Sequence, residues 1–310
     1  MLVKLLFMVV VLINAPLQGS GQGNDDFAQK RLLMEIISND IEANPIISSD
    51  GRTLYFNRRY HPENFNGKED VQDVWFSELQ ANGQWSEPVN LGDIINGPDF
   101  DAIYSLSPDG RMAIFHNSQR KKHRPIAISR NLDDYGWERP LPVKIANYYN
   151  LNQYADFHHS FIQNVLILAV EREDSQGKQD LYLSFLQENG SYSEPQNLGP
   201  VVNTSESDFA PFLGHDNRSL FFASYGHDGM GGSDLYVSYR LDETWMNWTE
   251  PVNLGPYINT PGDETYISLT ADFEYMYIDS HDPNGKNRNL YQIETPIKFN
   301  PFKRPYARRK

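Results

Sequence analysis

One segment recurs along this chain, and its recurrence constrains the fold more than any other feature. Residues 234–255 read DLYVSYRLDETWMNWTEPVNLG, and the pattern returns at residues 73–92 and 180–199. A weaker copy covers residues 125–143 and carries WERP near its end. Each copy combines an aromatic or β-branched strand signal, a polar turn and a second strand signal. Repetition over such distances indicates a fold built from repeated structural units.

A second motif alternates with the first. An acidic residue opens an extended run, a turn pair such as Asp50-Gly51 closes it, and an aliphatic or aromatic strand follows. Two strands joined by an Asp-Gly type of turn form a β-hairpin. The acidic residues that open these runs are Glu42, Asp101, Asp156, Asp208 and Asp263. A unit of about 50 residues with four short strands matches one blade of a β-propeller.

The sequence therefore predicts an all-β fold, a single five-bladed propeller of four-stranded blades covering residues 31–298. Six blades would need a sixth acidic marker, and the sequence contains five. The fifth unit ends near Gln292 without an outermost strand, which would leave an unpaired sheet edge. We expect residues 31–38 (RLLMEIIS) to supply that strand and so close the ring.

The first 22 residues have the pattern of a secretory signal peptide. Lys4 precedes a short apolar run, and the small residues Gly19, Ser20 and Gly21 follow. The apolar run is shorter than the ~20 residues that span a membrane. We therefore expect a periplasmic or secreted protein that does not span the membrane after cleavage. Residues 23–30 are expected to form a flexible N-terminus, and residues 299–310 a basic tail.

Composition excludes several kinds of site. The chain has no cysteine, so it can form neither disulfides nor thiolate metal sites. With 27 basic and 41 acidic residues its net charge is −14, which repels phosphate backbones. We expect no nucleic-acid partner.

The repeats resemble those of TolB-like β-propellers, which have WD-like repeats and occur in exported bacterial envelope proteins. The resemblance rests on SPDGR at residues 107–111, SSDGRTLYF at 48–56 and GMGGSDLYVS at 229–238. It covers about residues 42–292, although Pro125 and the pair Gln163-Asn164 depart from the pattern. Related propellers often precede an OmpA-like domain. The resemblance implies an interaction module, a rigid ring that presents loops to a partner. We expect this module to be non-catalytic and monomeric, to need no cofactor, and to bind an envelope protein or a glycan.

The five acidic residues Glu42, Asp101, Asp156, Asp208 and Asp263 are the first candidate site. On inner strands they would lie near one rim of the central channel and could bind a ligand there. Such carboxylates could hold a cation or a polyol, or act as the pair that glycoside hydrolysis needs. Alternatively, each caps a turn by accepting backbone N–H groups, and repetition in every unit favours this structural role. A glycoside hydrolase remains the alternative function.

Other motifs give weaker signals. Trp75 and Trp245 lie outside the register of the recurring tryptophans, so we predict exposed, partner-binding side chains. The loop 226–234 (GHDGMGGSD) could bind Ca²⁺ or simply form a glycine-dependent hairpin loop. His158 and His159 are adjacent, so on a strand they point in opposite directions. We predict no metal site and no catalytic residue.

Overall fold

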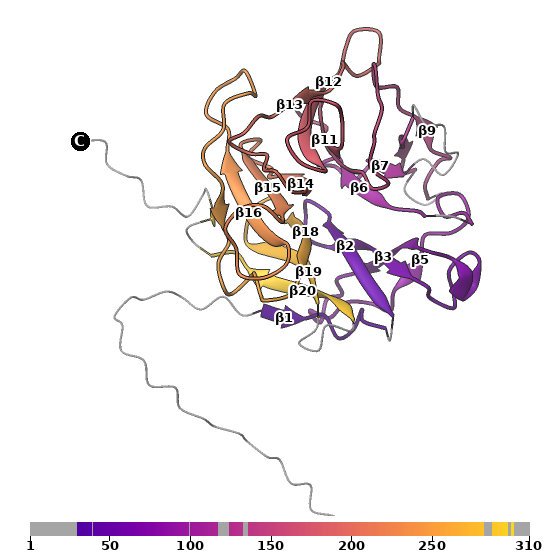
Figure 1. The fold of residues 1–310 in the computed structure, drawn as a ribbon. Coiled ribbons are helices and arrows are strands. Elements are labelled where there is room, and N and C mark those ends of the chain that lie inside the picture. The colour runs from indigo at the N-terminus through magenta and orange to yellow at the C-terminus, as the bar shows by residue number, and fades with distance from the viewer. Residues whose placement is uncertain are drawn as a thin grey trace, which may run out of the picture.

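The computed structural model describes residues 30–38, 40–98, 100–116, 124–132, 136–281, 287–296 and 299–300. Twenty strands in these residues form five four-stranded antiparallel sheets, and η1 (Gly67–Glu69) is a 3₁₀ turn between two of the strands. The sheets surround a common centre as a five-bladed propeller (Figure 1), which confirms the predicted fold class.

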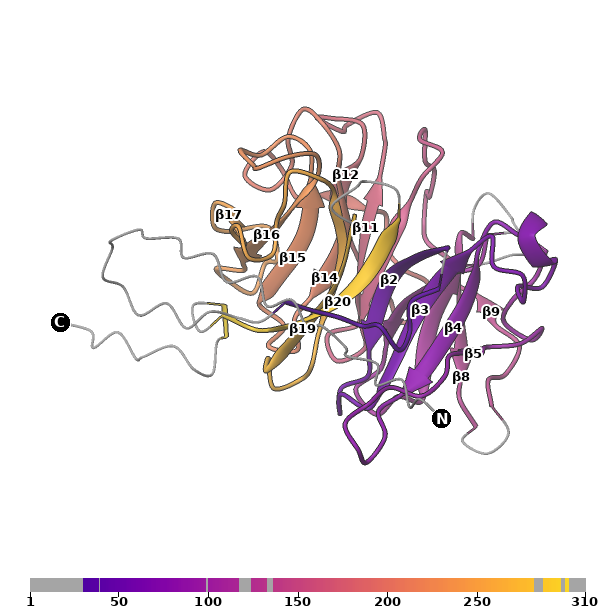
Figure 2. The same ribbon diagram turned by 90° about the horizontal axis from the view of Figure 1, so that it is seen from below.

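Each blade runs from an inner to an outer strand. Blade 1 contains β2 (Ile41–Ile47), β3 (Thr53–Arg59), β4 (Asp73–Glu78) and β5 (Val89–Asn90). Blade 2 contains β6 (Ile103–Leu106), β7 (Met112–His116), β8 (Ile126–Arg130) and β9 (Leu141–Pro142). Blade 3 contains β10 (Asp156–Ser160), β11 (Val165–Val170), β12 (Asp180–Phe185) and β13 (Gln196–Asn197). Blade 4 contains β14 (Asp208–Leu213), β15 (Ser219–Ser224), β16 (Asp234–Tyr239) and β17 (Val252–Asn253). Blade 5 contains β18 (Glu264–Leu269), β19 (Tyr275–His281), β20 (Arg288–Glu294) and β1 (Lys30–Leu32). Figure 2 shows β2 to β5 fanning outward in this order.

The N-terminal segment closes the ring, as predicted. Strand β1 pairs antiparallel with β20, and Arg31 lies opposite Gln292. The strand covers three residues rather than all of residues 31–38, because the chain turns after Leu33. The Leu33 N–H donates to the Leu290 carbonyl, just as the Leu254 N–H donates to Leu235 in blade 4. Residues 30–36 therefore reproduce the outer edge of the other blades.

The recurring Asn-Leu-Gly motif has a structural role. In blade 4, Asn253 donates to the Asp234 carboxylate, and Asn259 donates to the Asn253 side-chain oxygen. Asn259 also accepts the N–H of Leu235 and donates to its carbonyl, so one amide side chain pairs with the edge of β16 like a strand. We call this network the Asp–Asn–Asn clip. Blades 1 and 3 contain the same clip, built from Asp73, Asn90 and Asn96 and from Asp180, Asn197 and Asn203.

Several predicted segments fall outside the described residues. The predicted signal peptide (1–22) is among them, as are all of the flexible N-terminus except Lys30 and all of the basic tail except Phe299 and Asn300. In the described part of the chain, no helix is long and apolar enough to cross a membrane.

Candidate functional site

The two ends of the ring carry different parts of the strands and loops. Inner strands begin at one end, which we call the mouth, and reach their tight turns at the other, which we call the turn end. Antiparallel pairing places the start of each inner strand beside the end of the second strand, as Asp208 lies opposite Ser224. The predicted acidic residues and the loops that follow the second strands therefore meet at the mouth.

Most of the predicted acidic residues are structural caps. The carboxylates of Glu42, Asp101 and Asp208 each accept the backbone N–H of the residue four positions earlier, at 2.6–3.0 Å. All three side chains are buried. Burial raises the pKa of Glu42 and of Asp208, so the raised pKa follows from their position in the fold.

In blade 5 the repeat position belongs to Glu264 rather than to the predicted Asp263. Glu264 accepts the Thr260 N–H at 2.8 Å and is fully buried, like its counterparts in other blades. Asp263 precedes β18 by one residue and points elsewhere. The sequence could not separate the two because both are acidic and adjacent.

Asp156 also differs from these caps. Its carboxylate accepts the Tyr266 hydroxyl at 2.7 Å, from blade 5 to blade 3. Burial raises the pKa of Asp156, and the Tyr266 hydrogen bond opposes that rise. Burial raises the pKa of Tyr104 in blade 2 well above its usual range, and the nearby charge of Asp156 adds to this rise. These three side chains place a polar cluster across the channel.

Asp263, by contrast, is accessible. Its side chain is 28% exposed; one oxygen accepts the Ser233 N–H at 2.9 Å, and the other lies 3.4 Å from His281 Nδ1. Tyr225 is 50% exposed, and its ring stacks on Phe209 with 5.4 Å between centroids. Burial, followed by the charge of Asp263, raises the pKa of Tyr225. Tyr225, Asp263 and His281 form what we call the mouth cluster, between blades 4 and 5.

The glycine-rich loop 226–234 supports this cluster. The Gly232 N–H donates to the Gly262 carbonyl at 2.9 Å. A Cβ atom on Gly232 would lie 2.1 Å from an Asp263 oxygen, and one on Gly231 would lie 2.4 Å from the Pro261 backbone. The glycines are therefore needed for close packing. Among the described residues, no group of three or more acidic or histidine side chains could hold a metal ion.

The prediction that Trp75 and Trp245 are exposed is wrong. They are 2% and 6% exposed. The Trp75 indole N–H donates to Asn64, and the Arg58 guanidinium lies 4.6 Å above its ring. Trp245 has a positive φ of 66°, packs against Trp248 and is covered by Arg240. Arginine side chains shield both rings, a covering that the repeat pattern does not reveal.

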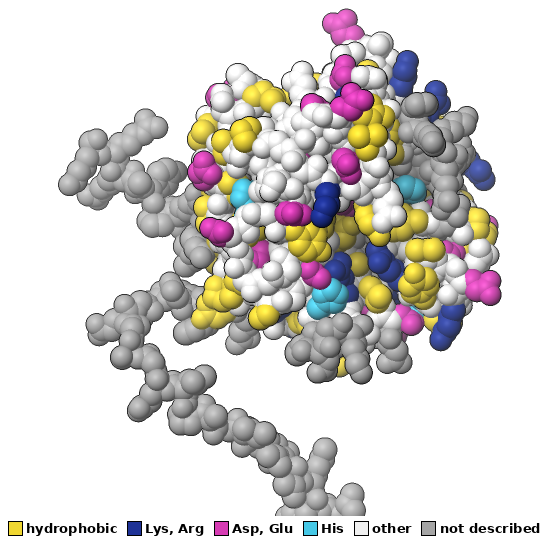
Figure 3. Space-filling view, viewed as in Figure 1, with side chains coloured by type: hydrophobic (Ala, Val, Ile, Leu, Met, Phe, Trp, Pro, Cys, Tyr) yellow, Lys and Arg dark blue, Asp and Glu magenta, His cyan; other side chains and the backbone are white. Residues whose placement is uncertain are grey.

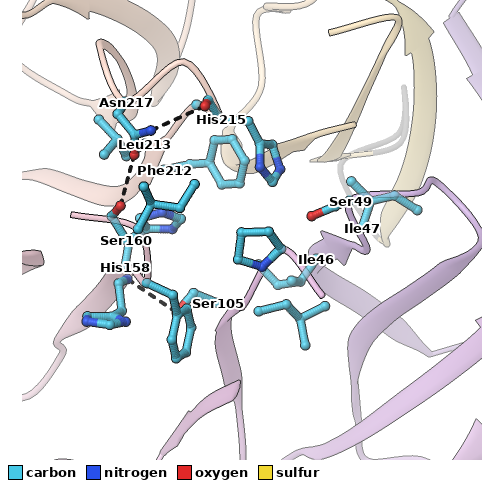
Figure 4. Close-up of a pocket in the computed structure, with 16 residues that line it drawn as sticks. Ile46, Ile47, Ser49, Ser105, His158, Ser160, Phe212, Leu213, His215 and Asn217 are labelled. Atoms are coloured by element: carbon cyan, nitrogen blue, oxygen red, sulfur yellow. Dashed lines mark hydrogen bonds between the residues drawn. The ribbon is translucent and has the colours of Figure 1, made fainter. Parts of the chain in front are cut away.

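A small cavity of about 40 Å³ lies at the turn end (Figure 4). His158 and His215 line it, and Asn217 bridges His215 and Ser160 beside it. His158 Nδ1 is buried without a hydrogen-bond partner. Burial lowers the pKa of His158 to about 3 and that of His159 to about 4, so both rings are neutral near pH 7. A cavity of this size has room for water rather than for a larger ligand.

A more open groove of about 400 Å³ lies beside the ring-closing segment, and its lining includes Glu35, Glu63, Glu87 and Arg58. Arg58 is already paired with Glu42 at 3.3 Å and donates to the Ile36 carbonyl. The groove is thus acidic. Elsewhere, the face in Figure 3 has acidic, basic and hydrophobic side chains interspersed rather than one patch of a single charge.

Known structures share this architecture. No protein-family model matches the sequence, and comparison with curated proteins gives no significant match. A solved complex of BT0996 with RGII is similar with a TM-score of 0.58 at 10% identity, covering 92% of this protein and 94% of that one. A solved glycoside hydrolase has a TM-score of 0.56 at 10% identity, and the match covers 92% of this protein and 93% of that one. An α-L-arabinofuranosidase from Lactobacillus brevis has a TM-score of 0.50 at 13% identity, and the match covers 86% of this protein and 96% of that one. At such low identities the similarity establishes the fold alone. The protein is a five-bladed β-propeller with an accessible polar and aromatic cluster at one end of the ring.

Proposed function

We propose that this protein is a non-catalytic, exported propeller of the TolB-like kind that binds a glycan or a protein of the cell envelope at its mouth. One observation carries the non-catalytic part. The four carboxylates at the repeat position in blades 1, 2, 4 and 5 are buried and accept backbone N–H groups. Carboxylates held in this way have no access to a substrate.

Exposed tyrosines support binding at the mouth. Tyr60 and Tyr225 directly follow second strands, and Tyr154 lies two residues before β10. All three are exposed, and all three lie at the end of the ring where inner strands begin. Tyrosine gives a large, rigid and amphipathic contact area, which suits both sugar rings and protein surfaces.

A glycoside hydrolase is the second candidate. Burial raises the pKa of Asp156, and a raised pKa is what a general acid requires. Asp156 also lies at the start of an inner strand, at the mouth. Asp263 is an accessible carboxylate at the same end. Solved structures of the same fold include a glycoside hydrolase and an α-L-arabinofuranosidase, which adds support for a carbohydrate ligand under either candidate.

One experiment separates the two functions. The mature protein is incubated with a panel of plant and bacterial polysaccharides, and both retention in affinity gels and release of reducing ends are measured. Binding without release of reducing ends supports the proposal. Release that disappears in Asp156→Asn would overturn it in favour of the hydrolase. A protein that neither binds these polysaccharides nor captures a specific envelope protein in a pull-down contradicts the proposal.

A further inference from the structure

We propose that the mouth cluster is a subsite for a neutral, hydroxylated ring, such as one sugar unit of a glycan. Tyr225 forms the platform, and Asp263 with His281 forms the polar edge. This inference rests on the proposed function, because it assigns the chemistry of a ligand that binds at the mouth.

The Tyr225 ring is held in place by stacking, and about half of its surface is exposed. Tyr225 packs against Phe209 with an interplanar angle of 20°, and half of the tyrosine surface stays exposed. Phe209 itself is buried on the inner strand β14, so it fixes the plane of the ring above it. A rigid aromatic face with few conformations to lose is well suited to stack against the apolar face of a sugar ring.

The polar edge offers both hydrogen-bond roles. An ionised Asp263 accepts hydrogen bonds, and the oxygen that is not bound by the Ser233 N–H lies beside His281. An imidazole offers one donor and one acceptor nitrogen when neutral, and two donors when protonated. A pair of neighbouring hydroxyls can donate to such a carboxylate and also bond the imidazole, whereas an aliphatic ring cannot.

Charge selects against anionic ligands. Asp263 is the carboxylate of the cluster, and the protein has a net charge of −14. Arg288, the cation that acts on Tyr225, is itself paired with Asp279 at 3.8 Å. A carboxylated or phosphorylated ring would place like charges together. The ligand class favoured by this cluster is therefore neutral.

The cluster is held in place before a ligand arrives. The Glu264 N–H donates to the Ser233 carbonyl, and the Gly232 N–H donates to Gly262, so two backbone bonds join the loops of blades 4 and 5. A Cβ on Gly232 would collide with Asp263, which shows how closely this loop supports the carboxylate. Preorganised side chains lose less entropy on binding and so bind more tightly.

The test uses purified neutral oligosaccharides of arabinose, galactose and glucose with the mature protein, and titration calorimetry as the readout. Tyr225→Phe keeps the platform and should retain affinity within about threefold, whereas Tyr225→Ala and Asp263→Asn should each lose roughly tenfold, corresponding to ~1.4 kcal/mol. Tyr275→Ala is the matched control, because Tyr275 is also exposed but begins β19 at the turn end.

The outcomes distinguish this inference from the proposed function. If the wild type binds an oligosaccharide and the Tyr225→Ala and Asp263→Asn variants bind equally well, the mouth cluster is not the subsite, although the binding function stands. Equal losses in Tyr275→Ala would also overturn the assignment. Tighter binding of uronic-acid oligosaccharides than of neutral ones contradicts the predicted charge preference. Circular dichroism and unfolding curves show whether each variant is folded, and Tyr225→Phe provides a conservative second test of the platform.

Discussion

The hydroxyl of Tyr266 in blade 5 donates a hydrogen bond to the carboxylate of Asp156 in blade 3, at 2.7 Å, and the same carboxylate accepts a backbone hydrogen bond from Ala210 of blade 4. Most contacts in a propeller join strands of one blade or of adjacent blades. The hydrogen bond from Tyr266 to Asp156 crosses the channel and links two non-adjacent blades directly. It also distinguishes Asp156 from the capped acidic residues of the other blades.

Tyr266→Phe should destabilise the ring by about 1–3 kcal/mol, because it leaves a buried carboxylate without one of its hydrogen-bond donors. Urea unfolding of the purified protein measures this change. Tyr275→Phe removes a hydroxyl from an exposed tyrosine and is the control. Similar unfolding free energies for the two variants would show that the bond across the channel contributes no stability.

Asp73 should make stability depend on pH between about pH 4 and pH 6. Burial raises the pKa of Asp73 to about 6, against hydrogen bonds from Asn90 and Phe65 that lower it. The native protein thus holds this proton in a range where the unfolded chain, with a pKa of about 3.9, has lost it. The stabilisation is complete below that value and disappears as the pH rises through about 6.

The non-titrating variant Asp73→Asn isolates this effect. The free energy of unfolding of the wild type, relative to that of the variant, should decrease from pH 4 to pH 7. Denaturant titrations at four or five pH values provide the measurement. Parallel curves for the two proteins would show that Asp73 titrates alike in the native and unfolded states.

His158 should have the opposite dependence. Burial lowers its pKa to about 3, whereas the unfolded chain binds this proton near pH 6.5. The contribution of His158 is therefore present above about pH 6.5 and is lost as the pH falls toward 3.

His158→Phe removes the titration and keeps an aromatic ring beside Phe212, which lies 5.0 Å from the imidazole. The wild type should lose more stability than this variant between pH 7 and pH 4, as measured by thermal or urea unfolding. An equal loss in both proteins contradicts the prediction.

Ile36 should be essential to ring closure. It is fully buried after β1, at the position that Ile258 occupies after β17. Ile36→Ala should cost about 2–5 kcal/mol, because it leaves a cavity beneath the closing segment. Met34→Ala, two residues away, is the matched control, since Met34 is 70% exposed and surface changes stay within about 0.5 kcal/mol. If the two alanine variants are equally stable, the segment does not hold the ring together.

Features that recur could be predicted from the sequence. The acidic residues that open the inner strands and the strand–turn–strand segments between them recur along the chain, so their spacing predicted five four-stranded units and the missing outer strand. The length of β1 could not be predicted, because the backbone turn after Leu33 depends on packing against β20. The choice between Asp263 and Glu264 depends on a one-residue register that two adjacent acidic residues conceal.

The candidate site was harder to find for a related reason. Tyr225 and His281 occupy the same position in adjacent blades, directly after the residue that pairs with the repeat acid, but their side chains differ, so no sequence periodicity marks them. The tryptophans illustrate the converse error. Trp75 and Trp245 departed from the register and suggested exposure, yet Arg58 and Arg240 cover them.

The Asp–Asn–Asn clip has a consequence for how such a ring can diversify. The clip holds the first residue of the third strand, where the loop from the second strand ends at the mouth. That loop can therefore vary without disturbing the sheet. Residues 60–72 in blade 1 and residues 225–233 in blade 4 differ in length and content, yet both end at a clip aspartate. The scaffold and its binding loops can thus evolve almost independently, and a new specificity could be grafted onto one blade at a time.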